Sequence, residues 1–231
     1  SDDLETMAKW ILKILSKKGI AIIEVQYLLN TIKDLTFDNI YHEHYNYWSL
    51  TSLKFFFDRL GANIFKAEKI NTHGGSLRIY ISKDKSKKKH KSVKNFLYEE
   101  EKFGVKNFKT YQVFSKKIEE IKKNVLKNIN KLNLKNKIIG YGSPAKATTA
   151  LNYFGISKEI DFIVEDNKLK HGKLIPGVNI PIYSKAKVKD KNYLVLILAW
   201  NFFKEIRKNN KKLSNKFISI KDLEKNNKFN Q

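Results

Sequence analysis

The sequence predicts an α/β protein, and three observations carry this prediction. Segments with helical and with strand periodicity alternate along most of the 231 residues. Residues 20–25 and 193–198 are short apolar runs with the length and composition of buried strands. Residues 140–145 form a glycine-rich turn between another apolar run and a helical segment, which is typical of a β-α-β unit.

The first third of the chain predicts helices and strands in an order that begins with a helix. Residues 3–33 predict a helix, a strand and a second helix. After a loop, Ser49 or Thr51 begins a further helix, and residues 63–70 and 76–82 predict two strands joined by a short turn. This order is similar to the closing part of a class I methyltransferase sheet, whose last two strands form a hairpin.

The preceding strands of such a sheet have no counterpart in this sequence. The glycine-rich turn that would hold S-adenosylmethionine (SAM) has none either. A sheet that starts at its fifth strand cannot bury both faces. We therefore expect residues 1–82 to be the end of a methyltransferase domain whose beginning is absent or is supplied by another chain.

Residues 83–136 predict a lysine-rich helical connector. A charged stretch at 83–91 leads into it, and Glu99-Glu100-Glu101 is expected to lie on the same solvated surface. Apolar residues nonetheless recur at helical spacing, which predicts a long amphipathic helix. These residues are Phe108, Tyr111, Phe114, Ile118, Ile121, Val125, Ile129 and Leu132.

Residues 137–231 predict a Rossmann-like domain. A strand at 137–141 runs into the glycine turn, a helix follows, and a strand at 160–164 ends in Glu165-Asp166-Asn167. A later strand at 193–198 stops at Trp200-Asn201. Strand, glycine turn, helix, and strand with a terminal acid together form a β-α-β unit of Rossmann type.

The charge balance is strongly basic, with a formal net charge of +23. A nucleic-acid binder is disfavoured, because only Arg59, Arg78 and Arg207 among the 46 basic residues are arginine, the side chain that best reads bases and phosphates. The excess can still attract anions such as nucleotide diphosphates. The chain has no cysteine and no apolar run of membrane-spanning length, so we expect a cytoplasmic protein that is not held in a membrane.

The tetrapeptide Tyr41-His42-Glu43-His44 places a phenol, a carboxylate and two imidazoles in four positions. These are the side chains needed to remove a proton from carbon and to hold the resulting charge, so we favour a proton-transfer site. A packed, hydrogen-bonded loop is one alternative. Metal binding, with His73 as a further ligand, is another, although neighbouring residues of a loop seldom all face one ion.

Two further segments are candidate binding sites. Gly140-x-Gly142-x-x-Ala145 fits the alanine variant of the dinucleotide fingerprint, and phosphate binding there competes with a purely structural turn and with NAD chemistry. His73-Gly74-Gly75-Ser76 is either a hairpin turn or a place where a substrate meets the backbone. Arg78 is suited to a diphosphate or carboxylate, and equally to a structural salt bridge.

These motifs together resemble the SAM-dependent sugar C-methyltransferases that act on 4-keto nucleotide sugars. The resemblance runs from near residue 1 to about residue 207. It rests on Phe37-Asp38-x-Ile40 with the tetrapeptide, on His73 to Tyr80, and on Gly140 to Lys146, in that order. In the family, a zinc-binding domain comes first, then a SAM-binding domain, then a Rossmann-like domain, with the sugar nucleotide held between the last two.

The resemblance implies that this chain holds the end of the second domain and all of the third. SAM would be bound mainly by a segment absent from this chain, zinc would belong to the missing N-terminal domain, and a separate N-terminal half is a possible partner. We expect this chain alone to be inactive. A nucleotide-binding module without catalysis is the alternative function.

The resemblance also implies roles for individual residues. His44 would remove the proton on the carbon next to the keto group of a nucleotide-linked sugar, Glu43 would orient His44 or share the proton, and Tyr41 would donate to the enolate oxygen. The implied substrate-binding residues are His42, His73, Gly74, Gly75, Ser76, Arg78, Gly140, Tyr141, Gly142, Pro144, Ala145, Lys146, Asn167 and Asn201.

Overall fold

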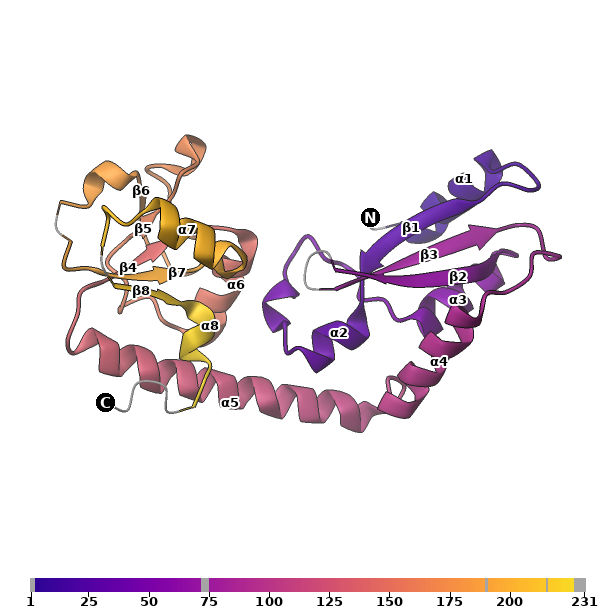
Figure 1. The fold of residues 1–231 in the computed structure, drawn as a ribbon, viewed down its shortest axis with the longest axis horizontal. Helices are drawn as coiled ribbons and strands as arrows, with labels where there is room; N and C mark the ends of the chain where they lie inside the picture. The colour runs from indigo at the N-terminus through magenta and orange to yellow at the C-terminus, as the bar shows by residue number, and fades with distance from the viewer. Residues whose placement is uncertain (1–2, 72–74, 190, 215, 227–231) are drawn as a thin grey trace. The chain divides into compact units, whose positions relative to one another are not determined.

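The structure, a computed structural model, describes residues 3–71, 75–189, 191–214 and 216–226. The chain divides into two compact units (Figure 1). The first unit comprises Ser1–Phe37 and His42–Lys116, and the second comprises Asp38–Tyr41 and Lys117–Gln231. The division crosses the Tyr-His-Glu-His loop, so Tyr41 is described with the second unit and the other three residues with the first.

The first unit holds an antiparallel three-stranded sheet in the order β1-β3-β2. Its elements are α1 (Leu4–Ile14), β1 (Ala21–Gln26), α2 (Leu28–Lys33), α3 (Leu50–Arg59), β2 (Asn63–Ile70), β3 (Ser76–Ser82) and α4 (Lys91–Phe103). The side chain of Asp3 caps α1 by accepting from the N–H of Thr6, and Ser49 forms a capping box with Ser52 at the start of α3. The hairpin of β2 and β3 is the sheet ending that the sequence predicts.

The core of the first unit lies on one face of this sheet. Leu77, Ile79 and Ile81 alternate along β3 and are fully buried, and they belong to one cluster with residues of α1, α3 and α4. Arg78 and Tyr80 point to the opposite face, where Arg78 pairs with Glu24 across the strands. The strand periodicity of the sequence thus places every second side chain of β3 in the core.

The lysine-rich segment forms two helices, α4 and then α5 (Phe108–Asn133). Gly104 ends α4 in the left-handed conformation, with φ 81°. The predicted apolar face of α5 is confirmed where Ile118, Val125 and Ile129 are buried. The expectation that Glu100 is solvated is wrong, because its exposed fraction is 1%. The charged residues around Glu100 gave no sign of its burial, because the donors that make burial of a carboxylate tolerable come from distant parts of the chain.

The second unit is built on a five-stranded sheet in the order β6-β5-β4-β7-β8, parallel throughout among the described residues. The strands are β4 (Ile138–Tyr141), β5 (Ile163–Val164), β6 (Ile182–Tyr183), β7 (Leu194–Ile197) and β8 (Lys216–Ser219). The α-helices beside it are α6 (Ala145–Phe154), α7 (Phe203–Asn209) and α8 (Ile220–Leu223), with α5 preceding it in the chain. Short 3-10 helices are η1 (Phe37–Asn39), η2 (Lys168–Lys170), η3 (Lys185–Lys187) and η4 (Trp200–Phe202).

The predicted α/β fold class is confirmed, and so is the parallel β-α-β unit. β4 and β7 are buried at every position, which explains why their sequences read as continuous apolar runs. The chain starts the sheet at β4, adds β5 and β6 on one side, and returns to place β7 on the other. The strand order therefore reverses between β4 and β7, at the place where open α/β sheets bind ligands. In the described part of the chain, no helix is long and apolar enough to cross a membrane.

Candidate functional site

The Tyr-His-Glu-His loop has no regular secondary structure between η1 and α3. The side chains of His42 and Glu43 are 83% and 64% exposed, and His42 Nε2 lies 4.0 Å from Glu43 Oε1. His44 is half-buried, and its ring meets the ring of Tyr47 edge-on at 6.5 Å between centroids. Within the first unit, the loop thus presents one shielded imidazole beside an exposed imidazole and carboxylate.

The second predicted segment is only partly within the described residues, because His73 and Gly74 lie outside them. Gly75 adopts φ 108°, and a Cβ there would lie 1.9 Å from Asn30 Nδ2. Ser76 is buried at the start of β3. Arg78 donates to Glu24 Oε2 from Nε at 3.3 Å and from Nη2 at 3.0 Å. Glycine at position 75 therefore serves close packing, and Arg78 holds a cross-strand salt bridge.

The second unit has a pocket of about 500 Å³ at the carboxyl ends of β4 to β7. Residues 141–144 contribute the glycine turn, Glu165, Asp166 and Asn167 follow β5, and Lys185 follows β6. The pocket thus occupies the point where the strand order reverses. Among the predicted site residues, it brings together Tyr141, Gly142, Pro144 and Asn167.

The glycine turn in this pocket is held by a carboxylate of the protein itself. Glu165 Oε2 accepts from the N–H of Ser143 at 2.8 Å and from its Oγ at 2.6 Å. Glu165 Oε1 accepts from the N–H groups of Asp166 and Asn167 at 2.9 and 3.1 Å. Burial favours the protonated form of Glu165, but the hydrogen bonds from Ser143 and Asn167 outweigh it and lower the pKa. The N–H of Ser143 in this turn is therefore already bound within the protein.

The two glycines of this turn have different roles. A Cβ on Gly140 would lie 2.8 Å from Ile163 Cγ1 and 3.0 Å from Leu198 Cδ1, so glycine is required there for packing between strands. Gly142 has φ 86°, and a Cβ would lie 2.9 Å from Ala199 Cβ. Only a residue without a side chain fits that backbone without strain.

Next to the turn lies a hydrogen-bonded group centred on Asp166. Its Oδ2 accepts from the hydroxyl of Tyr141 at 2.8 Å, and its Oδ1 lies 2.8 Å from Lys185 Nζ. Burial opposes ionisation of Asp166, but Lys185 and Tyr141 outweigh it and lower the pKa. Burial raises the pKa of Tyr141, and Asp166 raises it further, so Tyr141 stays a neutral donor at physiological pH.

A second cluster in the same unit involves the segment that precedes Tyr41. The indole N–H of Trp200 donates to Asp38 Oδ2 at 2.8 Å, and Asp38 is 3% exposed. Lys221 Nζ lies 3.9 Å from Asp38 Oδ1, and Lys146 Nζ lies 5.5 Å from the centroid of the Trp200 ring. Burial lowers the pKa of Lys146. The negative charge of Asp38 opposes this lowering, and the positive charge of Lys221 adds to it. These contacts attach Asp38 to the Rossmann-like unit just before Tyr41, which is half-buried.

The remaining predicted residues differ in their surroundings. Asn167 caps η2 by accepting from the N–H of Leu169 at 3.0 Å. Asn201 is exposed in η4, and Ala145 begins α6. Sequence reasoning missed Lys185 as a pocket residue and gave no role to Asp38. No spacing marks Lys185, whereas Asp38 and Trp200 stand in segments that the sequence analysis singled out.

Metal binding was the alternative for the Tyr-His-Glu-His loop. In the part of the chain that the structure describes, no group of three or more His, Cys, Asp or Glu side chains is placed to hold a metal ion. His73, the further ligand in that alternative, lies outside the described residues.

Comparison with known proteins places the chain in a family. Residues 71–219 match the model of the C-methyltransferase C-terminal domain. The chain is also 30% identical over 214 residues to the C-methyltransferase NovU of Streptomyces niveus. The chain belongs to the C-methyltransferase family.

The two matches differ in how much of the chain they cover. The domain model spans α4 to β8 together with β3, so it includes the whole pocket of the second unit. The match to NovU covers 90% of the chain but 51% of NovU. The chain thus spans about half the length of the curated relative that it matches, and the resemblance seen in the sequence is confirmed at the level of the family.

Proposed function

We propose that this chain is the part of a SAM-dependent C-methyltransferase that binds a nucleotide-linked keto sugar and removes a proton from the carbon next to the keto group. The observation that carries the proposal is the arrangement of the Tyr-His-Glu-His loop. In this loop a half-buried His44 follows the exposed His42 and Glu43. A base shielded from bulk water beside a second titratable group suits proton abstraction from carbon.

In the proposed reaction, His44 acts as the general base. A keto group acidifies the neighbouring C–H bond, and a neutral imidazole is well matched to remove that proton near pH 7. The proton moves to His44, and the electron pair of the broken C–H bond moves toward the keto oxygen to give an enolate. Glu43 orients His44 or shares its proton. Tyr41 donates a hydrogen bond to the enolate oxygen, where negative charge develops.

The methyl donor is assigned to residues outside this chain. SAM, when bound, supplies the methyl group that the nucleophilic carbon takes up. Among the described residues of the first unit, no strand is followed by a glycine turn and then a helix, so these residues do not fit SAM on their own. We assign the zinc of the family to the N-terminal part as well. In this proposal an N-terminal part, on the same polypeptide or on a separate partner chain, supplies both.

The nucleotide part of the substrate is assigned to the pocket of the second unit. The pocket lies where the strand order reverses, and open α/β sheets bind nucleotides at such points. Asn167 and the carboxylate of Asp166 can bind sugar hydroxyls. Lys170 and Lys185, which pair with Glu165 and Asp166 in this structure, are the cations that a diphosphate would contact. The volume of about 500 Å³ is within the range of small-ligand sites.

The first test is a calorimetric titration of this chain with thymidine diphosphate at moderate salt, which screens non-specific attraction by lysine. We expect saturable binding at one site. A nucleic-acid binder would instead prefer polynucleotides and lose affinity steeply with salt. Absence of thymidine diphosphate binding would contradict the assignment of the nucleotide to this pocket.

The second test separates catalysis from binding. In the complete enzyme, His44→Asn should abolish methyl transfer, while thymidine diphosphate should bind this chain as before. A nucleotide-binding module without catalysis is the alternative, favoured by the fact that the pocket is formed wholly within the second unit. Under that alternative, neither the wild-type complete protein nor its His44→Asn variant transfers a methyl group.

A further inference from the structure

We infer that Glu100, on α4 of the first unit, is a positioning residue that fixes both ends of the segment carrying His42, Glu43 and His44. The inference rests on the proposed function in one respect, since the proposed function gives this segment its catalytic role. The hydrogen bonds of Glu100 do not depend on the proposed function.

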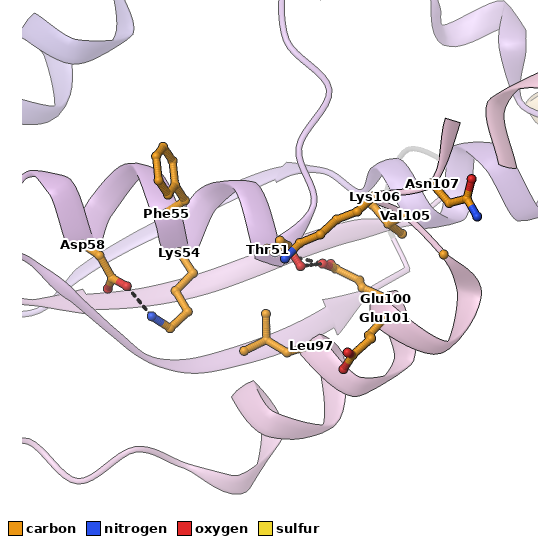
Figure 2. Close-up of a pocket in the computed structure, with 11 residues that line it drawn as sticks. Thr51, Lys54, Phe55, Asp58, Leu97, Glu100, Glu101, Val105, Lys106 and Asn107 are labelled. Atoms are coloured by element: carbon orange, nitrogen blue, oxygen red, sulfur yellow. Dashed lines mark hydrogen bonds and ion pairs between the residues drawn. The ribbon is translucent and has the colours of Figure 1, made fainter. Parts of the chain in front are cut away.

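Glu100 is a buried carboxylate that accepts four hydrogen bonds. Oε1 accepts from the hydroxyl of Tyr27 at 2.9 Å and from the N–H of Leu50 at 2.6 Å. Oε2 accepts from the N–H and the Oγ1 of Thr51 at 2.8 and 2.6 Å. Figure 2 shows Glu100 reaching from α4 to Thr51 at the start of α3. A carboxylate with an exposed fraction of 1% is tolerable only when its oxygens are satisfied in this way.

The donors come from the two ends of one chain segment. Tyr27 directly follows β1, Leu50 and Thr51 begin α3, and residues 28–49 run between them. The N–H of Leu28 donates to the carbonyl of Trp48 at 2.9 Å, so the ends also lie side by side in the backbone. The carboxylate of Glu100 thus links both ends of segment 28–49 to α4.

Helix capping alone does not account for this arrangement. Ser49 already caps α3 locally, since its Oγ accepts from the N–H of Ser52 at 3.0 Å. At a solvated helix start, water could satisfy the N–H groups of Leu50 and Thr51. Glu100 instead comes from 50 residues away and adds a bond to Tyr27, on the other side of the segment. Tyr27 stands directly before α2, but its bond to Glu100 runs through the phenol and satisfies no N–H group of that helix, so it is explained by fixing the segment.

The open groove beside Glu100 has a volume of about 700 Å³ and is lined by Lys54, Asp58 and Lys106 among others (Figure 2). It is not an anion site at the start of α3, because the carboxylate of Glu100 already occupies the N–H groups of Leu50 and Thr51. The carboxylate is thus an internal ligand of this helix start.

Glu100→Gln separates this role from packing because it keeps the shape of the side chain. An amide has one acceptor oxygen, so in either orientation its NH₂ faces a backbone N–H, that of Leu50 or that of Thr51, where the carboxylate had an acceptor. The hydroxyl on that side can turn to accept from the amide, but the backbone N–H cannot, so one buried donor is left facing another. Glu101→Gln is the matched control, because it makes the same change one residue along at an exposed side chain.

The test is amide hydrogen exchange of this chain, followed in peptides that cover residues 28–49 and, for comparison, β3. We expect Glu100→Gln to raise exchange in 28–49 about tenfold over wild type and over Glu101→Gln, with β3 unchanged. Equal rates in Glu100→Gln and Glu101→Gln would overturn the inference. So would a rise of the same factor in β3, because that would mean general destabilisation.

Two milder variants keep the test decisive if Glu100→Gln fails to fold. Tyr27→Phe and Thr51→Val each remove one side-chain donor with little change of shape. Each should raise exchange in 28–49 several-fold and leave β3 unchanged, and wild-type exchange in both would overturn the inference.

The kcat and KM of the complete enzyme distinguish positioning of the base from a purely structural role. Glu100→Gln should lower kcat at least tenfold with KM within about twofold, because it changes the placing of the base and leaves the pocket of the second unit intact. If the wild-type enzyme transfers no methyl group, the proposed function fails, while the exchange result still decides whether Glu100 holds the segment.

Discussion

At the scale of single residues, the proposed reaction makes the phenol of Tyr41 a donor to a developing enolate oxygen. One placed donor of this kind stabilises the transition state by about 3 kcal/mol, so Tyr41→Phe should lower kcat of the complete enzyme about 100-fold. Steady-state kinetics on the keto nucleotide sugar measures this. Tyr45→Phe, at an exposed tyrosine of the same loop, is the control and should leave kcat unchanged. Wild-type turnover in Tyr41→Phe would remove Tyr41 from the mechanism.

Glu165 makes a second prediction at this scale, concerning stability. Its pKa is lowered in the folded protein, so its carboxylate stabilises the second unit above the ordinary pKa of about 4.5, and this contribution is lost as the pH falls from there through the lowered pKa. Glu165→Gln leaves some of the donors of Ser143, Asp166 and Asn167 without an acceptor, which should cost about 2 kcal/mol at pH 7.

Urea unfolding of wild type and Glu165→Gln at pH 7 and pH 4 checks the sign and the size. The two proteins should differ most at pH 7 and converge as the pH falls. Glu205→Gln, also at the rim of the pocket but exposed, should behave as wild type throughout. A difference between wild type and Glu165→Gln that grows toward low pH would contradict the role of the Glu165 carboxylate.

At the scale of elements, the turn from β4 to α6 depends on the glycine at position 142. A side chain there would adopt φ 86° and meet Ala199 Cβ at 2.9 Å. Gly155 ends α6 at φ 72°, and a Cβ added to it would have no other atom within 4 Å, so this position isolates the backbone strain. We expect Gly155→Ala to lose about 1 kcal/mol of unfolding free energy from backbone strain alone. Gly142→Ala should lose about 2 kcal/mol or more, since steric overlap adds to strain.

Chemical denaturation of both glycine variants measures the difference. Binding of thymidine diphosphate to Gly142→Ala adds a functional readout, because the turn lines the pocket to which the nucleotide is assigned. Equal stability losses in the two variants would mean that the turn yields to a side chain and that Ala199 does not restrict it.

The elements also show what a sequence can and cannot predict. β7 was predicted because a strand buried on both faces must be apolar throughout. β6 was missed because Pro181 stands directly before its two residues, and β8 because it begins with an exposed lysine. The Tyr-His-Glu-His loop was singled out as a candidate because its titratable side chains lie in consecutive residues. Glu100 was assigned to the surface, since its donors come from the end of β1 and from α3 and no local pattern reveals them.

At the scale of the whole molecule, each of the two compact units buries its own hydrophobic residues. The first unit buries Phe57 of α3, and the second unit buries Leu151 of α6 completely. Compact units with their own cores generally unfold as units. We therefore predict two calorimetric transitions for this chain. Leu151→Ala should shift one of them and Phe57→Ala the other, because each substitution removes about 3 kcal/mol or more from its own core.

The size of these shifts makes the prediction sharp. For units of this length, 1 kcal/mol corresponds to about 4 to 8 °C, so each substitution should move its own transition by about 10 °C or more and leave the other in place. Glu165→Gln should shift the transition that Leu151→Ala shifts, since both residues lie in the second unit. A single transition moved equally by Phe57→Ala and Leu151→Ala would mean that α5, which passes from one unit to the other, joins the two cores into one cooperative whole.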